Sequence, residues 1–221
     1  MISQAQKFKT QGSGNIPRVG ITGGIGSGKS TVCRIFHEAL GIPVFYADIW
    51  AKKLLNFDPE LREGIIEIFG SEAYTSDGDY NRPEVAKIAF SDPAKLAALN
   101  ALVHPAVEIA SRGWHEDQAA LGVHYTLKEA ALMIESGSHQ HLDSLIVVTA
   151  PENLRIQRVM ARDNVTEEQV RARMRGQLPE LDKLKLADFI MINDGTQLLI
   201  PQVWAVHQQI LSNLGVKVGA N

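Results

Sequence analysis

The chain of 221 residues is 45% apolar and 21% charged, a balance typical of a globular protein that buries a core. Its formal net charge of −3 gives no sign of a nucleic-acid partner or an anionic membrane surface. No run of about 18 apolar residues predicts a transmembrane helix. The single cysteine, Cys33, excludes an internal disulfide and favours a reducing compartment, so we expect a cytoplasmic location.

The N-terminal residues 1–17 are polar and contain the triplet Gly12-Ser13-Gly14. They lack the apolar stretch of a secretory signal. We therefore expect a flexible leader, followed by a folded domain over residues 18–217.

The first predicted elements are a strand, a helix and a second strand. Arg18 to Thr22 has the apolar character of a buried strand, and residues 30–40 carry their apolar side chains at helical spacing. Gly41 is expected to end this helix. The second strand is predicted at 43–47, so that Asp48 follows its carboxyl end.

The long stretch 49–118 has helical periodicity interrupted by turn signals. These signals are Asp58-Pro59, Gly70, Asp77-Gly78, Asp92-Pro93 and His104-Pro105. The stretch is too long for a simple crossover and is expected to form a helical insertion. Three further strands at 124–128, 144–149 and 187–193, with a last helix at 198–214, predict an α/β fold with a five-stranded parallel sheet flanked by helices.

The motif that carries most information is the loop after the first strand. Residues 23–30 match the phosphate-binding pattern G-x-x-x-x-G-K-[ST] at every fixed position. The glycines let backbone N–H groups turn toward a phosphate, Lys29 supplies a charge for the β- and γ-phosphates, and the Ser30 hydroxyl is a hard ligand for Mg²⁺. The residues expected to contact ATP are Gly24, Ile25, Gly26, Ser27, Gly28, Lys29, Ser30 and Thr31, and Ser30 is the expected metal ligand.

A phosphate loop alone does not distinguish kinases from nucleotide-dependent switches. The Asn-Lys-x-Asp stretch of a guanine-specific switch is absent, whereas six of the eleven arginines lie between Arg155 and Arg175. Arg158 and Arg162 share one helical face with Arg155, and like charges so placed favour an arriving anion such as ATP. These features predict a kinase of a small molecule, with a helical lid.

The second half of this predicted lid opens with Thr166-Glu167-Glu168-Gln169, which fits a helical capping box. Glu167 and Arg171 are spaced i, i+4, so they can equally well pair on a solvated face.

Asp48 allows two interpretations. At the carboxyl end of a strand it can accept the proton of an attacking hydroxyl group, or hold Mg²⁺ through water. It can equally be the N-cap of a helix that begins near Ile49.

From about Arg18 to Leu214 the chain resembles the dephospho-CoA kinase family. The resemblance lies in Gly20 to Thr31, in Tyr46-Ala47-Asp48, and in the Arg158 to Gln177 stretch. It implies a P-loop kinase with a core of 18–48, 119–150 and 187–217, a substrate-binding helical region at 49–118 and a lid at 151–180. It also implies ATP-dependent phosphorylation of the ribose 3′-hydroxyl of dephospho-CoA.

The resemblance extends to individual residues. Asp48, Lys29 and Arg158 are expected to act in catalysis. Nucleotide contacts are expected from Arg158, Arg162, Asn193 and Gly195, and acceptor contacts from Asp48, Arg82, His104, Leu132 and Glu135. His104 is also compatible with a structural histidine.

Two departures from the family pattern bear on the acceptor. Residues 131–135 read Ala-Leu-Met-Ile-Glu where the family often has Pro-Leu-Leu-Phe-Glu, and Tyr46 replaces an aspartate. A kinase of another hydroxyl acceptor, such as a nucleoside, a nucleotide or a shikimate-like alcohol, is the alternative prediction, and an ATP-binding switch without an acceptor is a second.

Overall fold

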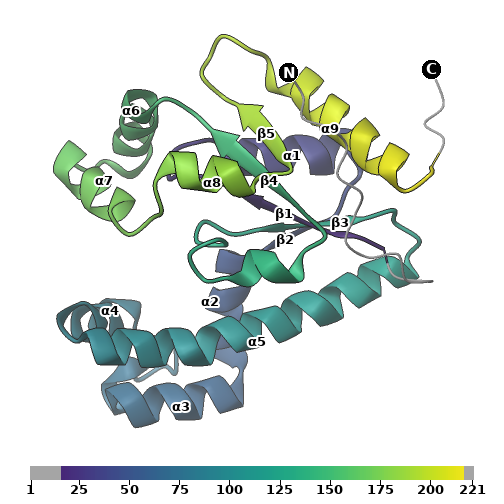
Figure 1. The fold of residues 1–221 in the computed structure, drawn as a ribbon. Helices are drawn as coiled ribbons and strands as arrows, with labels where there is room; N and C mark the ends of the chain where they lie inside the picture. Colours follow the sequence, from purple (N-terminus) through teal and green to yellow (C-terminus); the bar gives the residue numbers. More distant parts are fainter. Residues whose placement is uncertain (1–15, 217–221) are drawn as a thin grey trace. The chain divides into compact units, whose positions relative to one another are not determined.

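The computed structural model describes residues 16–216, and most of the predicted leader lies outside this range. The described chain divides into two compact units, one formed by the residues up to Phe45 and those from His115 onward, the other by Tyr46–Trp114. Figure 1 shows the helices and strands of both units. Within residues 16–216, no helix is both long and apolar enough to cross a membrane.

The first unit is built on the five-stranded parallel sheet that the sequence predicts. Its strands lie in the order β2-β3-β1-β4-β5. Their bounds are β1 Arg18–Thr22, β2 Val44–Tyr46, β3 Thr126–Glu129, β4 Ser144–Thr149 and β5 Phe189–Ile192. Because β1 pairs in register with both β3 and β4, the carboxyl ends of the central strands meet at one edge of the sheet.

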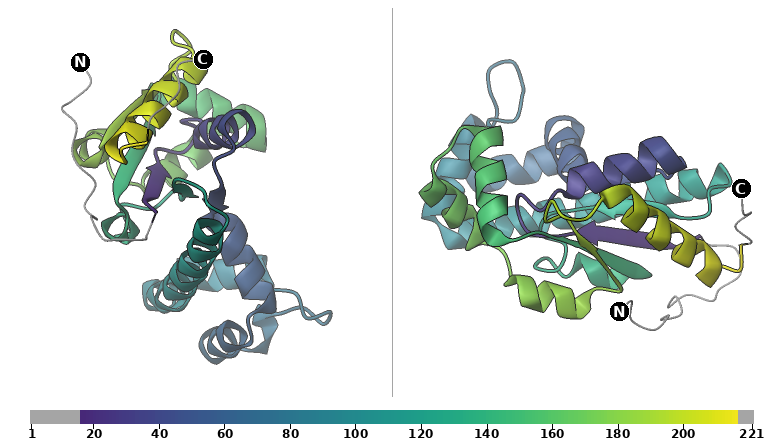
Figure 2. Two further views of the ribbon diagram at one scale, coloured as in Figure 1. Left: turned by 90° about the vertical axis from the view of Figure 1, so that its right-hand side faces the viewer. Right: turned by 90° about the horizontal axis from the view of Figure 1, so that it is seen from above.

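Helices cover both faces of this sheet (Figure 2). On one face, α1 (Lys29–Leu40) packs against α9 (Leu199–Asn213). On the other face, α8 (Glu180–Leu186) packs against β4, where Leu145 and Val147 join a buried cluster with Leu184. This placement follows from the apolar composition of β4, which must be buried on both sides.

Two further helices follow β4. Helix α6 (Glu152–Asp163) ends at Asn164, which adopts a left-handed conformation, and α7 (Glu167–Met174) begins with the predicted capping box at Thr166. Ile156, Val159 and Val170 form a small core between them. The two helices therefore have apolar contacts of their own.

The second unit consists of α2 (Ala47–Phe57), α3 (Pro59–Phe69), a 3₁₀ turn (Ser71–Ala73), α4 (Arg82–Ser91) and most of α5 (Pro93–Ala120). Asp58 and Asn81 cap α3 and α4 with their side chains. Ile65, Phe69 and Tyr74 belong to its buried core.

The turn predicted at His104-Pro105 is wrong. Helix α5 runs through Pro105 without ending. Proline removes one backbone donor from a helix, but here the chain on both sides continues in helical conformation, and the apolar packing of the unit includes Leu96, Leu99 and Leu102.

Two buried histidines make the folding stability depend on pH. The Tyr125 hydroxyl and His207 Nδ1 lie 2.8 Å apart, and burial, with a smaller effect of His124, lowers the pKa of His207 below its ordinary value of 6.5. Burial also lowers the pKa of His115. Both groups therefore bind protons more readily in the unfolded chain.

We expect the free energy of unfolding to fall as the pH decreases below about 6.5, because the unfolded chain then takes up protons that the folded chain excludes. His207→Gln should make this dependence shallower. Urea denaturation between pH 7.5 and 5.5 measures it. If the free energy of unfolding falls equally steeply with decreasing pH in the wild type and in the variant, His207 does not cause the pH dependence.

Candidate active site

The loop between β1 and α1 is positioned by its glycines. Gly26 and Gly28 have φ angles of 78° and 97°, in the left-handed region that favours glycine. A Cβ atom at Gly28 would also collide with the side-chain amide of Asn193, and one at Gly26 would meet the carbonyl oxygen of Arg155 at 2.5 Å. These glycines are thus required by the turn itself and by the segments packed against it.

Lys29 is the first residue of α1 and is buried, with 8% of its surface exposed. Its Nζ donates hydrogen bonds to the carbonyl oxygens of Gly23, at 3.0 Å, and Gly24, at 3.3 Å. Burying an ammonium group is costly unless it is hydrogen-bonded, and these carbonyls meet part of that requirement. The charge of Lys29 therefore lies inside the loop.

Ser27 provides a second polar group within the same loop. Its Oγ is buried and has no hydrogen-bond partner among residues 16–216. A buried hydroxyl without a partner is unfavourable, and a phosphate oxygen would supply an acceptor. The loop therefore fits the phosphate group that its sequence predicts.

Asn193, which follows β5, supports the loop from the side. Its side-chain amide donates to the carbonyl oxygen of Ser27 at 2.8 Å. Arg158 Nη1 donates to the Asn193 carbonyl oxygen at 3.0 Å. The structure thus brings together the predicted nucleotide contacts Ser27, Arg158 and Asn193. They come from the loop before α1, from α6 and from the turn after β5, where Gly195 has a φ of 88°.

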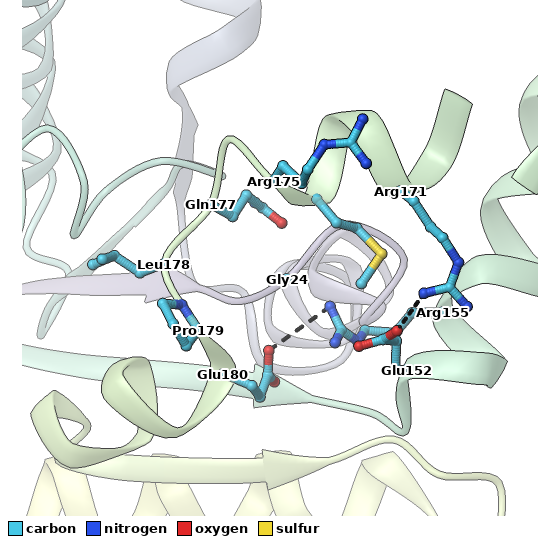
Figure 3. Close-up of a pocket in the computed structure, with 10 residues that line it drawn as sticks. Gly24, Glu152, Arg155, Arg171, Arg175, Gln177, Leu178, Pro179 and Glu180 are labelled. Carbon is cyan, nitrogen blue, oxygen red and sulfur yellow. Dashed lines mark hydrogen bonds and ion pairs between the residues drawn. The ribbon is translucent and has the colours of Figure 1, made fainter. Parts of the chain in front are cut away.

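A pocket of about 430 Å³ lies beside the loop (Figure 3). Its walls come from the loop, α6, α7 and the segment that leads into α8. The lining residues are Gly24, Glu152, Arg155, Arg171, Met174, Arg175, Gln177, Leu178, Pro179 and Glu180. Arg155 is buried in this wall, donates to the Ala150 carbonyl at 3.0 Å and lies 3.8 Å from the Glu180 carboxylate.

Most arginines of the predicted lid are paired with carboxylates. Arg162 and Arg173 both contact Asp163 at 2.7 Å, and the hydrogen bond from Arg162 is the largest contribution that lowers the pKa of Asp163 to about 2. Arg171 pairs with Glu167, as the i, i+4 alternative predicts, and also with Glu152. The expected contact of Arg162 with ATP stays a prediction.

Arg175 differs from these. Its guanidinium has no hydrogen bond or ion pair within the described residues, and Arg175 lines the same pocket as the loop residue Gly24. An exposed cation without a carboxylate partner is available to an anion. The sequence placed Arg175 in the lid but gave no reason to prefer it over its neighbours.

The sequence did not predict the contacts of the segment before α8 with the phosphate loop and with the segment after β3. Gln177 accepts a hydrogen bond from the Ile25 N–H at 2.8 Å and donates to the Ala131 carbonyl at 3.2 Å. Glu135 accepts from the Leu178 N–H at 2.9 Å. No local spacing pattern signals such contacts, because the partners lie 43 to 152 residues apart.

Glu135 also forms an ion pair with Lys183 at 2.9 Å, and the Lys183 side chain is 1% exposed. Burial alone raises the pKa of the Glu135 carboxyl, but the hydrogen bonds from Lys183 and Leu178 outweigh it, so the pKa is lowered. Glu135 is thus held as a carboxylate within the protein, and its predicted contact with the acceptor stays a prediction. Leu132, by contrast, is 47% exposed.

The N-cap interpretation of Asp48 is wrong. Helix α2 begins at Ala47 with Tyr46 at the N-cap position, so Asp48 lies in the first turn, exposed, and makes no capping hydrogen bond. A carboxylate there is favoured by the helix dipole and remains available for other chemistry. Arg82, at the start of α4, and His104, within α5, belong to the same unit, Tyr46–Trp114.

The donor set for Mg²⁺ is sparse. Ser30 lies exposed in the first turn of α1, directly after Lys29. Between residues 16 and 216 no group of three or more His, Cys, Asp or Glu side chains is arranged to hold a metal ion. A single hydroxyl fits Mg²⁺ that is bound mainly by substrate phosphates and water.

Comparison with known proteins identifies close relatives. A family model described as dephospho-CoA kinase matches residues 18–198. A dephospho-CoA kinase of Salinibacter ruber is 44% identical over 80% of this chain and 89% of the relative, and one of Chlorobaculum tepidum is 43% identical over 88% and 95%.

Solved structures agree. The crystal structure of TT1252 from Thermus thermophilus is 33% identical, has a TM-score of 0.74, and is matched over 90% of this chain and 98% of that one. A dephospho-CoA kinase from Campylobacter jejuni is 26% identical with a TM-score of 0.67, over 89% and 98% of the two chains.

We expect Asn193→Ala to weaken ATP binding by about tenfold, because the loss of the contact to Ser27 frees one side of the loop. Isothermal titration with ATP measures this. Asn213→Ala, which removes a side-chain contact to Gln209 at the end of α9, is the matched control. Equal affinities of the two variants would show that Asn193 does not support the nucleotide site.

Proposed function

This chain belongs to the dephospho-CoA kinase family, and we propose that it transfers the γ-phosphoryl group of ATP to the ribose 3′-hydroxyl of dephospho-CoA, using residues 23–31, the lid and Asp48. The reaction class of the family is phosphorylation of a hydroxyl group, in the last step of coenzyme A synthesis. We further propose that it does so in the cytoplasm.

The observation that carries the proposal is the buried Lys29 inside a glycine loop, beside a pocket lined by arginines. Phosphoryl transfer needs little covalent help from a protein, so positioning and charge neutralisation supply most of the rate. Lys29 exchanges its carbonyl contacts for phosphate oxygens, while the loop N–H groups and the amino end of α1 bind the same anion.

The lid residues then act on the transferring group. Arg175, with no partner among the described residues, meets the charge that develops on the γ-phosphoryl oxygens, and Arg155 keeps its place in the pocket wall. Arg158 and Asn193 hold the turn on which the adenine rests. Excluding water from this pocket prevents hydrolysis of ATP.

Asp48 accepts the proton of the 3′-hydroxyl as it attacks. Its exposed place in the first turn of α2, without a capping bond, leaves both carboxylate oxygens available for that proton. Ser30 would hold Mg²⁺, which neutralises charge on the β- and γ-phosphates when bound. Arg82, His104, Leu132 and Glu135 are the residues proposed to shape the acceptor site.

The test is ADP release from ATP·Mg²⁺ with and without dephospho-CoA. We expect strong stimulation by dephospho-CoA that disappears in Lys29→Ala, because the loop then lacks its charge. Nucleosides, nucleotides and shikimate serve as competing acceptors. Stimulation by one of these and not by dephospho-CoA would overturn the proposed substrate.

Asp48→Asn should lower kcat by about 10²- to 10⁴-fold with little change in the KM for ATP, since the amide cannot accept the proton. Steady-state kinetics at saturating dephospho-CoA provide the measurement. A change confined to the KM for ATP would exclude the role of base.

A further inference from the structure

Within residues 16–216, the Gln177 side chain forms hydrogen bonds both to the phosphate loop and to the segment after β3. Its Oε1 accepts from the Ile25 N–H at 2.8 Å, and its Nε2 donates to the Ala131 carbonyl at 3.2 Å. A primary amide suits this place because it accepts at one end and donates at the other. Figure 3 shows Gln177 in the pocket wall near Gly24.

The contact with Ile25 fixes a peptide unit that also holds Lys29. The N–H of Ile25 and the carbonyl of Gly24 belong to the same planar peptide group. That carbonyl accepts from Lys29 Nζ at 3.3 Å and from the Ser27 N–H at 3.1 Å. Holding the N–H end therefore also sets the direction in which the carbonyl faces the lysine.

We propose that Gln177 is a positioning residue for phosphoryl transfer, acting through the Gly24–Ile25 peptide on the ammonium group of Lys29. The inference rests on the proposed function, because it assumes that Lys29 neutralises the transferring phosphate. Donation by Ile25 also polarises its peptide and strengthens the carbonyl as an acceptor for Lys29.

The backbone around Gln177 is itself held firmly. The next residue, Leu178, donates its N–H to Glu135 at 2.9 Å, and Glu135 is paired with the buried Lys183. The Lys183 side chain is 1% exposed, and a polar interaction with a buried group is stronger than one at the surface. Gln177 thus presents its amide to Ile25 from a segment that is anchored through Leu178 to Glu135.

The Nε2 atom of Gln177 connects the loop to the segment that contains the proposed acceptor contacts. Ala131 directly precedes Leu132, which is exposed, and is followed by Glu135 at the end of the same turn. The Gln177 side chain therefore links the position of Lys29 to that of the segment proposed to contact dephospho-CoA. A shift of about 1 Å in such an arrangement is enough to lower a rate about 10²-fold.

Two variants distinguish the contributions of the Oε1 and Nε2 atoms of Gln177. Gln177→Met keeps the length and removes both hydrogen bonds, and we expect kcat to fall about 10- to 100-fold with less than about threefold change in the Kd for ATP. Gln177→Glu keeps an acceptor for Ile25, and we expect kcat nearer to the wild type, with a raised KM for ATP because its carboxylate repels the phosphates.

Gln209→Met in α9 is the matched control. It removes the hydrogen bond from Gln209 to Asn213, two residues that are distant from the loop in sequence, and it should retain the wild-type kcat. Steady-state kinetics, ATP titration and thermal melting are measured for all variants. If Gln177→Met lowers only the melting temperature, or lowers kcat no more than Gln209→Met, the positioning role is excluded. If the wild type itself shows no stimulation by dephospho-CoA, the proposed function fails instead.

Discussion

The buried ammonium of Lys29, held by two carbonyl oxygens of its own loop, is the constraint on which the rest of the site depends. When the N–H groups of a loop turn inward to bind an anion, the carbonyl groups of the same peptides point away from that anion. Such a loop needs hydrogen bonds and packing from other segments to keep its conformation. Support comes from three directions: Asn193 bonds to Ser27, Gln177 bonds to Ile25, and α6 packs beneath Gly26. All three supports come from distant parts of the sequence, joined by the parallel sheet.

The charged side chains of the predicted lid form exposed ion pairs on its outer helices and more buried contacts at its base. Arg171 and Arg173 pair with carboxylates at the surface, where solvent screens such contacts and their effect on stability is small. At the base, Arg155 is buried against Ala150, and the Lys183 side chain that pairs with Glu135 is 1% exposed. Breaking a buried pair is strongly unfavourable, so the contacts at the base contribute more to stability than the ion pairs at the surface.

Local signals in the sequence predicted the elements well and the site contacts poorly. The strand Ser144–Thr149 and the capping box at Thr166 are set by neighbouring residues, and the structure confirms them. Pro105 was misjudged because the packing of α5 outweighs a single missing donor. The partners of Gln177 could not be predicted, since hydrogen bonds between segments more than 40 residues apart leave no periodicity in the sequence.

The departure from the family pattern at residues 131–135 falls where it can be tolerated. Ala131 contributes its backbone carbonyl, which does not depend on the side chain, and Met133 and Ile134 are buried in an apolar cluster that requires volume and not a particular shape. The preceding residue is fixed by the Thr22 hydroxyl, which donates to the Ala130 carbonyl at 2.8 Å. The chain thus keeps the path of this segment while changing its side chains, so a different sequence here does not require a different acceptor.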